Sequence, residues 1–255
     1  MSSHGQFIWY DLITPDLDGS KSFYSHVIGW GTQESKGPQP YTMWENEGVP
    51  IGGLWPAAKG MGEAPQWLPY VSVDDVDATA SKAKELGGQV SAGPDDIPGG
   101  GRYAILEDPQ GAKFAIYRSG HSPQTPEFNP GCGQISWHEL ATTDQKKAFE
   151  FYSELFGWNR IRQIDMGPSG IYQVYGKGET MYGGMYDPTP QMPMATAWCC
   201  YIMVENIPDA LDRVSESGGQ VLNGPMEPPG TNAVVAQCTD PQGTLFGLHA
   251  TKTAP

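Results

Sequence analysis

Positive charge is scarce in this chain. Its 255 residues include 15 lysines and arginines against 29 aspartates and glutamates, which gives a formal net charge of −14. Proteins that bind nucleic acid neutralise phosphates with clustered lysine and arginine, so this composition argues against a nucleic-acid partner. The acidic balance would instead attract a cationic small molecule, although acidity is also a common means of keeping a protein in solution.

Long hydrophobic runs are also missing. No stretch approaches the ~20 consecutive apolar residues that a membrane-spanning helix needs. The first residues, MSSHGQFIWYD, lack a basic segment followed by a small-residue cleavage site, so they do not have the pattern of a secretory signal. We therefore expect a cytoplasmic protein that has no membrane partner.

Cysteine is rare as well, with four in the chain: Cys132, Cys199, Cys200 and Cys238. Cys199 and Cys200 are adjacent and would face opposite sides of a strand, which disfavours a disulfide between them. Reduced thiols, as in a cytoplasmic protein, are the simplest interpretation.

Common catalytic signatures are absent too. The sequence contains no G-x-S-x-G, H-E-x-x-H or C-x-x-C motif. The run GPDDIPGGGRY, from Gly93 to Tyr103, is rich in glycine, but it lacks the helix-opening pattern of a phosphate-binding loop. We interpret it as a mobile loop over a ligand cavity.

What the chain does contain is the same pattern twice. IWYDLITPDLDGSKSFYSHVIGW, from Ile8, aligns with SWHELATTDQKKAFEFYSELFGW, from Ser136. Farther along, WLPYVSVDDVDATASKAKELGGQV aligns with WCCYIMVENIPDALDRVSESGGQV, and LEDPQGAKFAIY aligns with CTDPQGTLFGLH. Because the matches keep their order, they indicate a tandem duplication. We place one domain at residues 1–122, a linker at 123–133 and a second domain at 134–255.

Within each copy, a strand–helix–strands pattern occurs two times. The apolar stretch FIWYDLIT predicts a strand, and Asp16 can cap the helix that follows it. Two short strands come next, and then LPYVSV, a helix from about Val76 to Leu86, and two strands joined by the DPQG turn. We therefore predict an α+β fold in which each copy has two βαβββ units, four in the whole chain.

Taken together, the FYSxxxGW helix, the ELGG helix end and the DPQG turn inside paired βαβββ units resemble the vicinal oxygen chelate superfamily. That group includes the glyoxalases, the bleomycin-resistance proteins and the extradiol dioxygenases. The resemblance covers nearly all of the chain, once in each copy. The tandem arrangement is similar to that of two-domain glyoxalase-like proteins. It implies a glyoxalase-like domain in each copy, with a cupped mixed sheet, helices outside and a ligand cavity inside. It permits either a monomer with pseudo-dimeric domains or a homodimer.

Metal-dependent members of that superfamily place His, Gln or Glu ligands on strands that face the cup. The resemblance carries those positions to Trp9, Gly53, Leu68 and Ala115 in the first copy, and to Trp137, Gly184, Cys199 and Gly247 in the second. Only Cys199 has a metal-binding side chain, and one thiolate does not make a site. We therefore predict no metal ligands and no cofactor, with a divalent metal at a displaced site as the alternative.

The stretch WHELATTD, from Trp137, places a histidine beside a glutamate. Because Leu140 must face the helix, strand alternation sends Glu139 into the cup and His138 toward the helix side as a structural residue. The same alternation turns His249 inward on the last strand. We predict that Glu139 and His249 approach one another across neighbouring strands as a catalytic acid–base pair, as displaced metal ligands, or as an ion pair at the rim. Asp11 and Tyr117 hold these places in the first copy, so any catalysis would be asymmetric.

Glycine pairs, Gly52–Gly53 and Gly183–Gly184, interrupt two inner strands at equivalent places and leave room for an organic ligand. The predicted ligand-binding residues are Trp9, Asp11, Gly53, Tyr117, Trp137, Glu139, Gly184 and His249. Other aromatic residues that line such a cavity or pack the core are Trp44, Trp55, Trp67, Tyr175, Tyr186 and Trp198.

These features favour a protein of the glyoxalase/bleomycin-resistance type that binds a small aromatic or cationic organic molecule without the usual metal site. The alternative is an enzyme, a lyase, an isomerase or a dioxygenase/hydroxylase-like catalyst, that acts on a small organic molecule through Glu139 and His249. In a third interpretation, one copy has lost its function and only completes the architecture.

Overall fold

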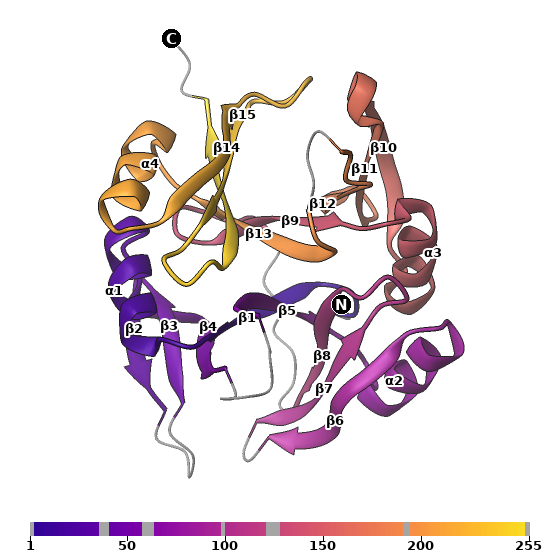
Figure 1. The fold of residues 1–255 in the computed structure, drawn as a ribbon. Helices are drawn as coiled ribbons and strands as arrows, with labels where there is room; N and C mark the ends of the chain where they lie inside the picture. The colour runs from indigo at the N-terminus through magenta and orange to yellow at the C-terminus, as the bar shows by residue number, and fades with distance from the viewer. Residues whose placement is uncertain are drawn as a thin grey trace. The chain divides into compact units, whose positions relative to one another are not determined.

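The computed structural model describes residues 3–35, 41–57, 64–97, 100–120, 128–190 and 194–252. These residues form sixteen strands, four α-helices and one 3₁₀ helix (Figure 1). Strand and helix order repeats after β8, which confirms the predicted α+β duplication with two βαβββ units in each copy. In the described part of the chain, no helix is long and apolar enough to cross a membrane.

The first repeat contains eight strands and two helices. Its elements are β1 (Phe7–Thr14), α1 (Leu17–Val27), β2 (Gly31–Glu34), β3 (Thr42–Asn46), β4 (Val49–Pro56), β5 (Gln66–Ser72), α2 (Val76–Glu85), β6 (Gln89–Ile97), β7 (Gly101–Glu107) and β8 (Lys113–Ser119).

The second repeat has the same order, with a 3₁₀ helix added. Its elements are β9 (Ile135–Ala141), α3 (Gln145–Phe156), β10 (Asn159–Asp165), η1 (Gly167–Ser169), β11 (Ile171–Lys177), β12 (Thr180–Tyr186), β13 (Ala197–Met203), α4 (Ile207–Glu216), β14 (Gln220–Met226), β15 (Ala233–Thr239) and β16 (Leu245–Thr251).

Each repeat builds one mixed sheet of eight strands. The strand order is β2-β3-β4-β1-β5-β8-β7-β6 in the first sheet and β10-β11-β12-β9-β13-β16-β15-β14 in the second. Within every βαβββ unit the first strand pairs in parallel with the last, as β1 does with β4 and β9 with β12. The helix provides the crossover that a parallel pair requires.

Contacts divide the chain into two compact units, and each unit draws on both repeats. Unit 1 contains Met1–Trp9, Leu68–Phe128 and His138–Trp198, and unit 2 contains Tyr10–Trp67, Asn129–Trp137 and Cys199–Pro255. Unit 1 thus joins the second half of the first repeat to the first half of the second. Helices α2 and α3 pack together in unit 1, and α1 and α4 do so in unit 2 (Figure 1). The domain boundaries expected at residues 122 and 134 stay predictions, and residues 123–127 of the expected linker lie outside the described residues.

Every α-helix begins at a side-chain cap. Asp16, Asp75, Asp144 and Asn206 each accept a hydrogen bond from the backbone N–H three residues later, as predicted for Asp16. Such caps satisfy amide groups that have no partner inside the helix. Helix α3 ends at Gly157, whose φ of 69° is the left-handed conformation that glycine adopts readily.

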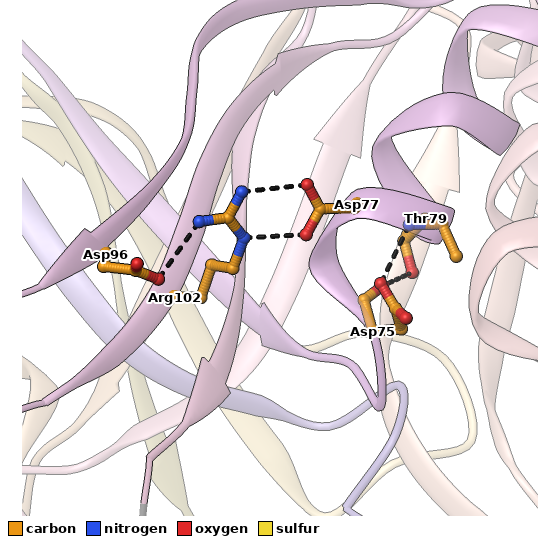
Figure 2. Close-up of polar contacts among 6 residues, drawn as sticks. Asp75, Asp77, Thr79, Asp96 and Arg102 are labelled. Atoms are coloured by element: carbon orange, nitrogen blue, oxygen red, sulfur yellow. Dashed lines mark hydrogen bonds and ion pairs between the residues drawn. The ribbon is translucent and has the colours of Figure 1, made fainter.

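The segment from Gly93 to Tyr103 is a hairpin rather than the loop predicted from its glycines. Its residues belong to β6 and β7, apart from Gly100 and residues 98–99, which lie outside the described part. Arg102 on β7 forms two hydrogen bonds with Asp77 of α2, at 2.7 and 2.9 Å, and one of 3.0 Å with Asp96 (Figure 2). The guanidinium therefore ties the hairpin to the helix.

None of the four cysteines is in a disulfide. Cys199, Cys200 and Cys238 are buried and Cys132 is exposed. Burial raises the pKa of the Cys200 thiol, so this group stays protonated and packs as a small apolar side chain.

Candidate functional site

Glu139 lies on β9 beside the glycine pair of β12. The two strands are parallel, with Glu139 opposite Gly184 in the register. Its neighbours His138 and Leu140 are both fully buried on the other face of the sheet, as strand alternation predicts. Glu139 itself is 8% exposed, and its carboxylate accepts a 2.8 Å hydrogen bond from the hydroxyl of Tyr172. A charge-assisted bond of this kind stabilises a carboxylate away from bulk water.

Tyr172 lies on β11, and its side chain extends across β12 to Glu139 on β9. A Cβ atom at Gly184 would lie 2.0 Å from Cε1 and 2.4 Å from the hydroxyl oxygen of Tyr172. Only glycine leaves this space open, because any side chain would overlap the ring. The ring of Tyr172 therefore fills the space that the sequence suggested for an organic ligand, and Gly184 as a ligand contact stays a prediction.

The first repeat has the same construction. Tyr41, just before β3, donates a 2.6 Å hydrogen bond to Oδ1 of Asp11 on β1. Its ring crosses β4 at Gly53, where a Cβ would lie 1.8 Å from the tyrosine hydroxyl. Asp11 and Gly53 face each other in the parallel register of β1 and β4. We call Asp11, Tyr41, Gly53 and Trp55 the Tyr41 site, and Glu139, Tyr172, Gly184 and Tyr186 the Tyr172 site.

The two sites differ in their second aromatic residue. In the Tyr41 site, Trp55 donates its indole N–H to Oδ2 of Asp11 at 2.9 Å, so both carboxylate oxygens have a donor. Trp55 is 42% exposed, and its ring centre lies 5.2 Å from that of Tyr41. In the Tyr172 site, Tyr186 is buried and stacks on Tyr172, with ring centres 6.1 Å apart. The Tyr41 site is thus the one that presents a large aromatic face to solvent.

His249 lies on β16, and its hydrogen-bond partner is Ser136. Ser136 Oγ is 2.7 Å from His249 Nδ1 and 3.3 Å from the carbonyl oxygen of Tyr201. If the serine donates to that carbonyl, it accepts from Nδ1–H and leaves a lone pair on Nε2. Burial lowers the pKa of His249, which favours the neutral ring. Among the described residues, no group forms a hydrogen bond with Nε2.

The expectation that Glu139 and His249 sit on neighbouring strands is wrong. In the strand order of the second sheet, β13 lies between β9 and β16. The prediction took the first and last strands of the repeat as adjacent, but the parallel pairs form within each βαβββ unit. Glu139 belongs to unit 1 and His249 to unit 2. Their joint role as an acid–base pair stays a prediction.

The remaining predicted ligand contacts have different surroundings. Tyr117, the counterpart of His249, donates a 2.7 Å hydrogen bond to the carbonyl oxygen of Gly100, so its hydroxyl helps to hold the β7–β8 region. Trp9 and Trp137 are half-buried. Tyr117 and His249 thus form different hydrogen bonds, and asymmetric catalysis stays a prediction.

His138 is a core residue. Its Nδ1 lies 2.8 Å from the carbonyl oxygen of Tyr182, and its ring stacks on Phe7 with centres 3.7 Å apart. Burial lowers the pKa of His138 to about 3, because the charged ring would lose its hydration. His138 is therefore neutral at physiological pH and has a structural role.

Most of the large aromatic residues expected along a cavity also belong to the core. Trp44 and Tyr175 are completely buried, and Trp67 and Trp198 are only 3% and 4% exposed. Their rings pack in edge-to-face and tilted contacts, as with Tyr24 against Trp67 at 5.3 Å. Of the further aromatic residues named from the sequence, Trp55 alone has a largely accessible ring.

A metal ion does not fit the side chains at the positions carried over from metal-dependent relatives. In the described ranges, no three His, Cys, Asp or Glu residues are grouped so that they could hold a metal. At Gly247 a Cβ would lie 2.3 Å from the ring of Tyr201, so this place, like Gly53 and Gly184, is covered by a tyrosine. Cys199 is buried and is not in a disulfide.

Tyr41 and Tyr172 were missed by the sequence reasoning, although the sequence contains a signal for both. Each tyrosine precedes its glycine by the same interval, because 53 − 41 and 184 − 172 are both 12. Spacing conserved between repeats points to a shared contact. The crossing of a ring over an intervening strand is not visible in local periodicity.

The family is shown by comparison with known proteins. A model of the Glyoxalase/Bleomycin resistance protein/Dioxygenase superfamily matches residues 6–116 and again residues 134–248. The chain belongs to this superfamily. Membership confirms the resemblance inferred from the FYSxxxGW and DPQG motifs, and the double match confirms the tandem arrangement.

Two relatives cover nearly the whole chain. Over 245 residues the chain is 30% identical to "Putative glyoxylase CFP32" of Mycobacterium tuberculosis, covering 94% of this chain and 92% of the relative. Over 256 residues it is 28% identical to the anthracycline biosynthesis protein DnrV of Streptomyces peucetius, covering 94% of this chain and 91% of the relative.

Solved structures share the fold at low identity. The 2,3-dioxygenase LapB from Pseudomonas sp. KL28 matches with a TM-score of 0.70 and 14% identity, covering 100% of this chain and 95% of LapB. The Mn(II)-bound glyoxalase from Novosphingobium aromaticivorans matches with a TM-score of 0.63 and 15% identity, covering 98% of this chain and 83% of that protein. At such identity the likeness concerns the fold alone.

Proposed function

We propose that this superfamily member binds a small, planar aromatic molecule, with a preference for a cationic one, at the Tyr41 site. The observation that carries the proposal is the Asp11 carboxylate. It is 2% exposed and accepts one hydrogen bond from Tyr41 and one from Trp55, while Trp55 keeps a large exposed face. An aromatic face held next to a carboxylate is a combination that suits stacking and cation attraction together.

The charge of the chain supports the same ligand class. A net charge of −14 raises the local concentration of cations near the surface and would speed their encounter with the site. The relative DnrV is named for anthracycline biosynthesis, and anthracyclines are planar aromatic compounds. The name supports an aromatic ligand for this chain without specifying which one.

Isothermal titration calorimetry with N-methylacridinium, a planar aromatic cation, tests the proposal. We expect binding to the wild-type protein, weakened about tenfold by Trp55→Ala, because stacking on one aromatic residue contributes on the order of 1 kcal/mol or more. Asp18→Asn is the matched control, since it removes an exposed carboxylate near α1. Equal affinity in wild-type and Trp55→Ala protein would contradict the proposed site.

A second candidate function is catalysis, and one observation favours it. The imidazole of His249 is oriented by Ser136 at Nδ1, is favoured in its neutral form, and has no described hydrogen-bond partner at Nε2. Such a nitrogen suits the general base of a lyase- or isomerase-type reaction. The carboxylate of Glu139, which belongs to the other unit, is a separate candidate for proton transfer. Because the carried-over positions do not fit a metal, no metal-dependent step is assigned.

Two variants separate catalysis from binding alone. In an enzyme, Glu139→Gln and His249→Asn would remove turnover of a bound substrate while most of the affinity stays, because proton transfer matters in the transition state. In a pure binding protein neither variant changes anything but affinity. A variant that keeps both turnover and affinity would remove its residue from the catalytic proposal.

A further inference from the structure

Tyr41 and Tyr172 place a phenol in the same environment twice. Each ring lies over a glycine of the middle strand, and each hydroxyl donates to a buried carboxylate on the strand beyond, at 2.6 and 2.8 Å. The two arrangements share no residues and belong to different units. Their repetition shows that the bare backbone and the carboxylate together form a surface that accepts a hydroxylated aromatic ring.

The chemistry of the surface is specific for a phenolic hydroxyl. The glycine leaves room for a flat ring against the strand, and the carboxylate accepts a hydrogen bond that a methyl ether or a plain hydrocarbon cannot donate. Asp11 is 2% exposed and Glu139 is 8% exposed, whereas both tyrosines are half-buried. In each site the tyrosine is therefore more exposed than the carboxylate to which it donates.

We propose that Tyr41 and Tyr172 are internal occupants of two phenol-binding subsites, and that the ligand of this protein is a hydroxylated aromatic molecule. Its ring takes the place of a tyrosine over Gly53 or Gly184, and its hydroxyl bonds to Asp11 or Glu139. The inference deepens the proposed function and rests on it, because it names the substrate class for the same carboxylates.

Competition between ligand and tyrosine has a measurable consequence. Tyr→Phe at either position removes the hydroxyl that competes for the carboxylate but leaves the ring in place. If the tyrosine can be displaced, the phenylalanine that replaces it no longer donates to the carboxylate and competes less well with the ligand. An external phenol then binds more tightly. If the tyrosine is instead a permanent wall of the site, the same substitution leaves affinity unchanged or lowers it.

Calorimetry with 2-naphthol and its methyl ether, 2-methoxynaphthalene, makes the test. We expect 2-naphthol to bind the Tyr41→Phe/Tyr172→Phe variant about tenfold more tightly than wild type, as a hydrogen bond of ~1.4 kcal/mol implies. The ether should change by less than about twofold. Tyr175→Phe is the matched control, because Tyr175 is also on β11 but donates to the carbonyl oxygen of His138 on the core side.

A variant of the two glycines tests independently whether the ligand ring lies against Gly53 or Gly184. Gly53→Ala/Gly184→Ala places a methyl group where each ring lies, so it should weaken 2-naphthol binding at least tenfold, whichever way the tyrosines respond. Unchanged or weaker 2-naphthol binding in the double Phe variant would overturn the inference, as would unchanged binding in the double Ala variant.

The outcomes also separate this inference from the proposed function. If wild-type protein binds N-methylacridinium, but 2-naphthol binds no better to the Phe variant, aromatic binding stands and the phenol subsites fall. If neither probe binds wild-type or variant protein, both the inference and the proposed function are overturned. Circular dichroism of each variant, compared with wild type, establishes that a lost signal comes from the site and not from unfolding.

Discussion

The hydroxyl of Tyr152 donates a 2.9 Å hydrogen bond to the carboxylate of Asp108, although the two residues belong to different repeats. Tyr152 is the tyrosine of the FYSELFGW helix, and Asp108 begins the DPQG turn. In unit 2 the same bond joins Tyr24 to Asp240 over 3.4 Å. The two motifs that indicate the family are therefore in contact. The helix tyrosine of each repeat donates to the turn aspartate of the other repeat.

We expect Tyr152→Phe to lower the free energy of unfolding by about 1–3 kcal/mol, because Asp108 would keep a buried carboxylate with one donor fewer. Asp108 is 2% exposed, and its other donors are the backbone N–H groups of Gln110 and Ala112. Burial already raises the pKa of Asp108, so the lost donor should raise it further. Urea unfolding measures the change.

Tyr103→Phe is the control for that experiment, since the hydroxyl of Tyr103 forms no hydrogen bond among the described residues. Equal unfolding midpoints for Tyr152→Phe and Tyr103→Phe would show that the bond to Asp108 contributes nothing.

The free energy of unfolding should decrease as the pH is lowered, over a range set by the titration of His138. Its pKa in the folded protein is about 3, below the ordinary value near 6.5, so the unfolded state binds the proton more readily. The stabilising contribution is complete above about pH 6.5 and is lost as the pH falls toward 3, which amounts to about 2 kcal/mol between pH 7.5 and pH 5. Urea unfolding at these two pH values measures it.

His138→Gln should flatten this dependence, because glutamine keeps a donor for the carbonyl of Tyr182 but does not titrate. His26→Gln serves as the matched variant, since His26 is an exposed residue of α1. The assignment to His138 would be refuted by a pH dependence that persists in His138→Gln and disappears in His26→Gln.

The two glycines of each pair should respond differently to alanine. At Gly183 a Cβ would lie 1.8 Å from the backbone carbonyl oxygen of His138, which cannot move without breaking the β9–β12 ladder. At Gly184 it would meet the ring of Tyr172, a side chain that can rotate away. We expect Gly183→Ala to cost several kcal/mol and Gly184→Ala about half as much or less. Thermal unfolding of both variants measures the two losses of stability. A larger loss for Gly184→Ala than for Gly183→Ala would contradict the prediction.

The purified protein should contain little bound metal. Because no three candidate ligands are grouped in the described residues, we expect no stoichiometric Ni²⁺, Zn²⁺, Mn²⁺ or Fe²⁺ in protein purified without chelators, measured by elemental mass spectrometry. Stoichiometric metal that is lost in a Glu139→Ala/His249→Ala variant would establish a displaced site and reverse the prediction.

Much of the fold follows from sequence patterns that are local. The alternation around Leu140 predicts the faces of β9, and this leucine is fully buried. Asp16 caps its helix as predicted, and the repeat order gives the two sheets. These features depend on the neighbours of a residue along one chain segment, so periodicity and capping rules are sufficient to find them.

The site depended on relations that no local pattern contains. The sequence identified Asp11, Glu139 and the glycine pairs, but it suggested that the glycines leave a vacancy and that β9 and β16 are neighbours. Strand order separated those strands, and the rings of Tyr41 and Tyr172 filled the space over the glycines. A tyrosine reaches a carboxylate two strands away only when its own strand pair is aligned with a third strand that is farther away in sequence. That alignment is decided by the packing of the whole sheet, which tertiary structure alone determines.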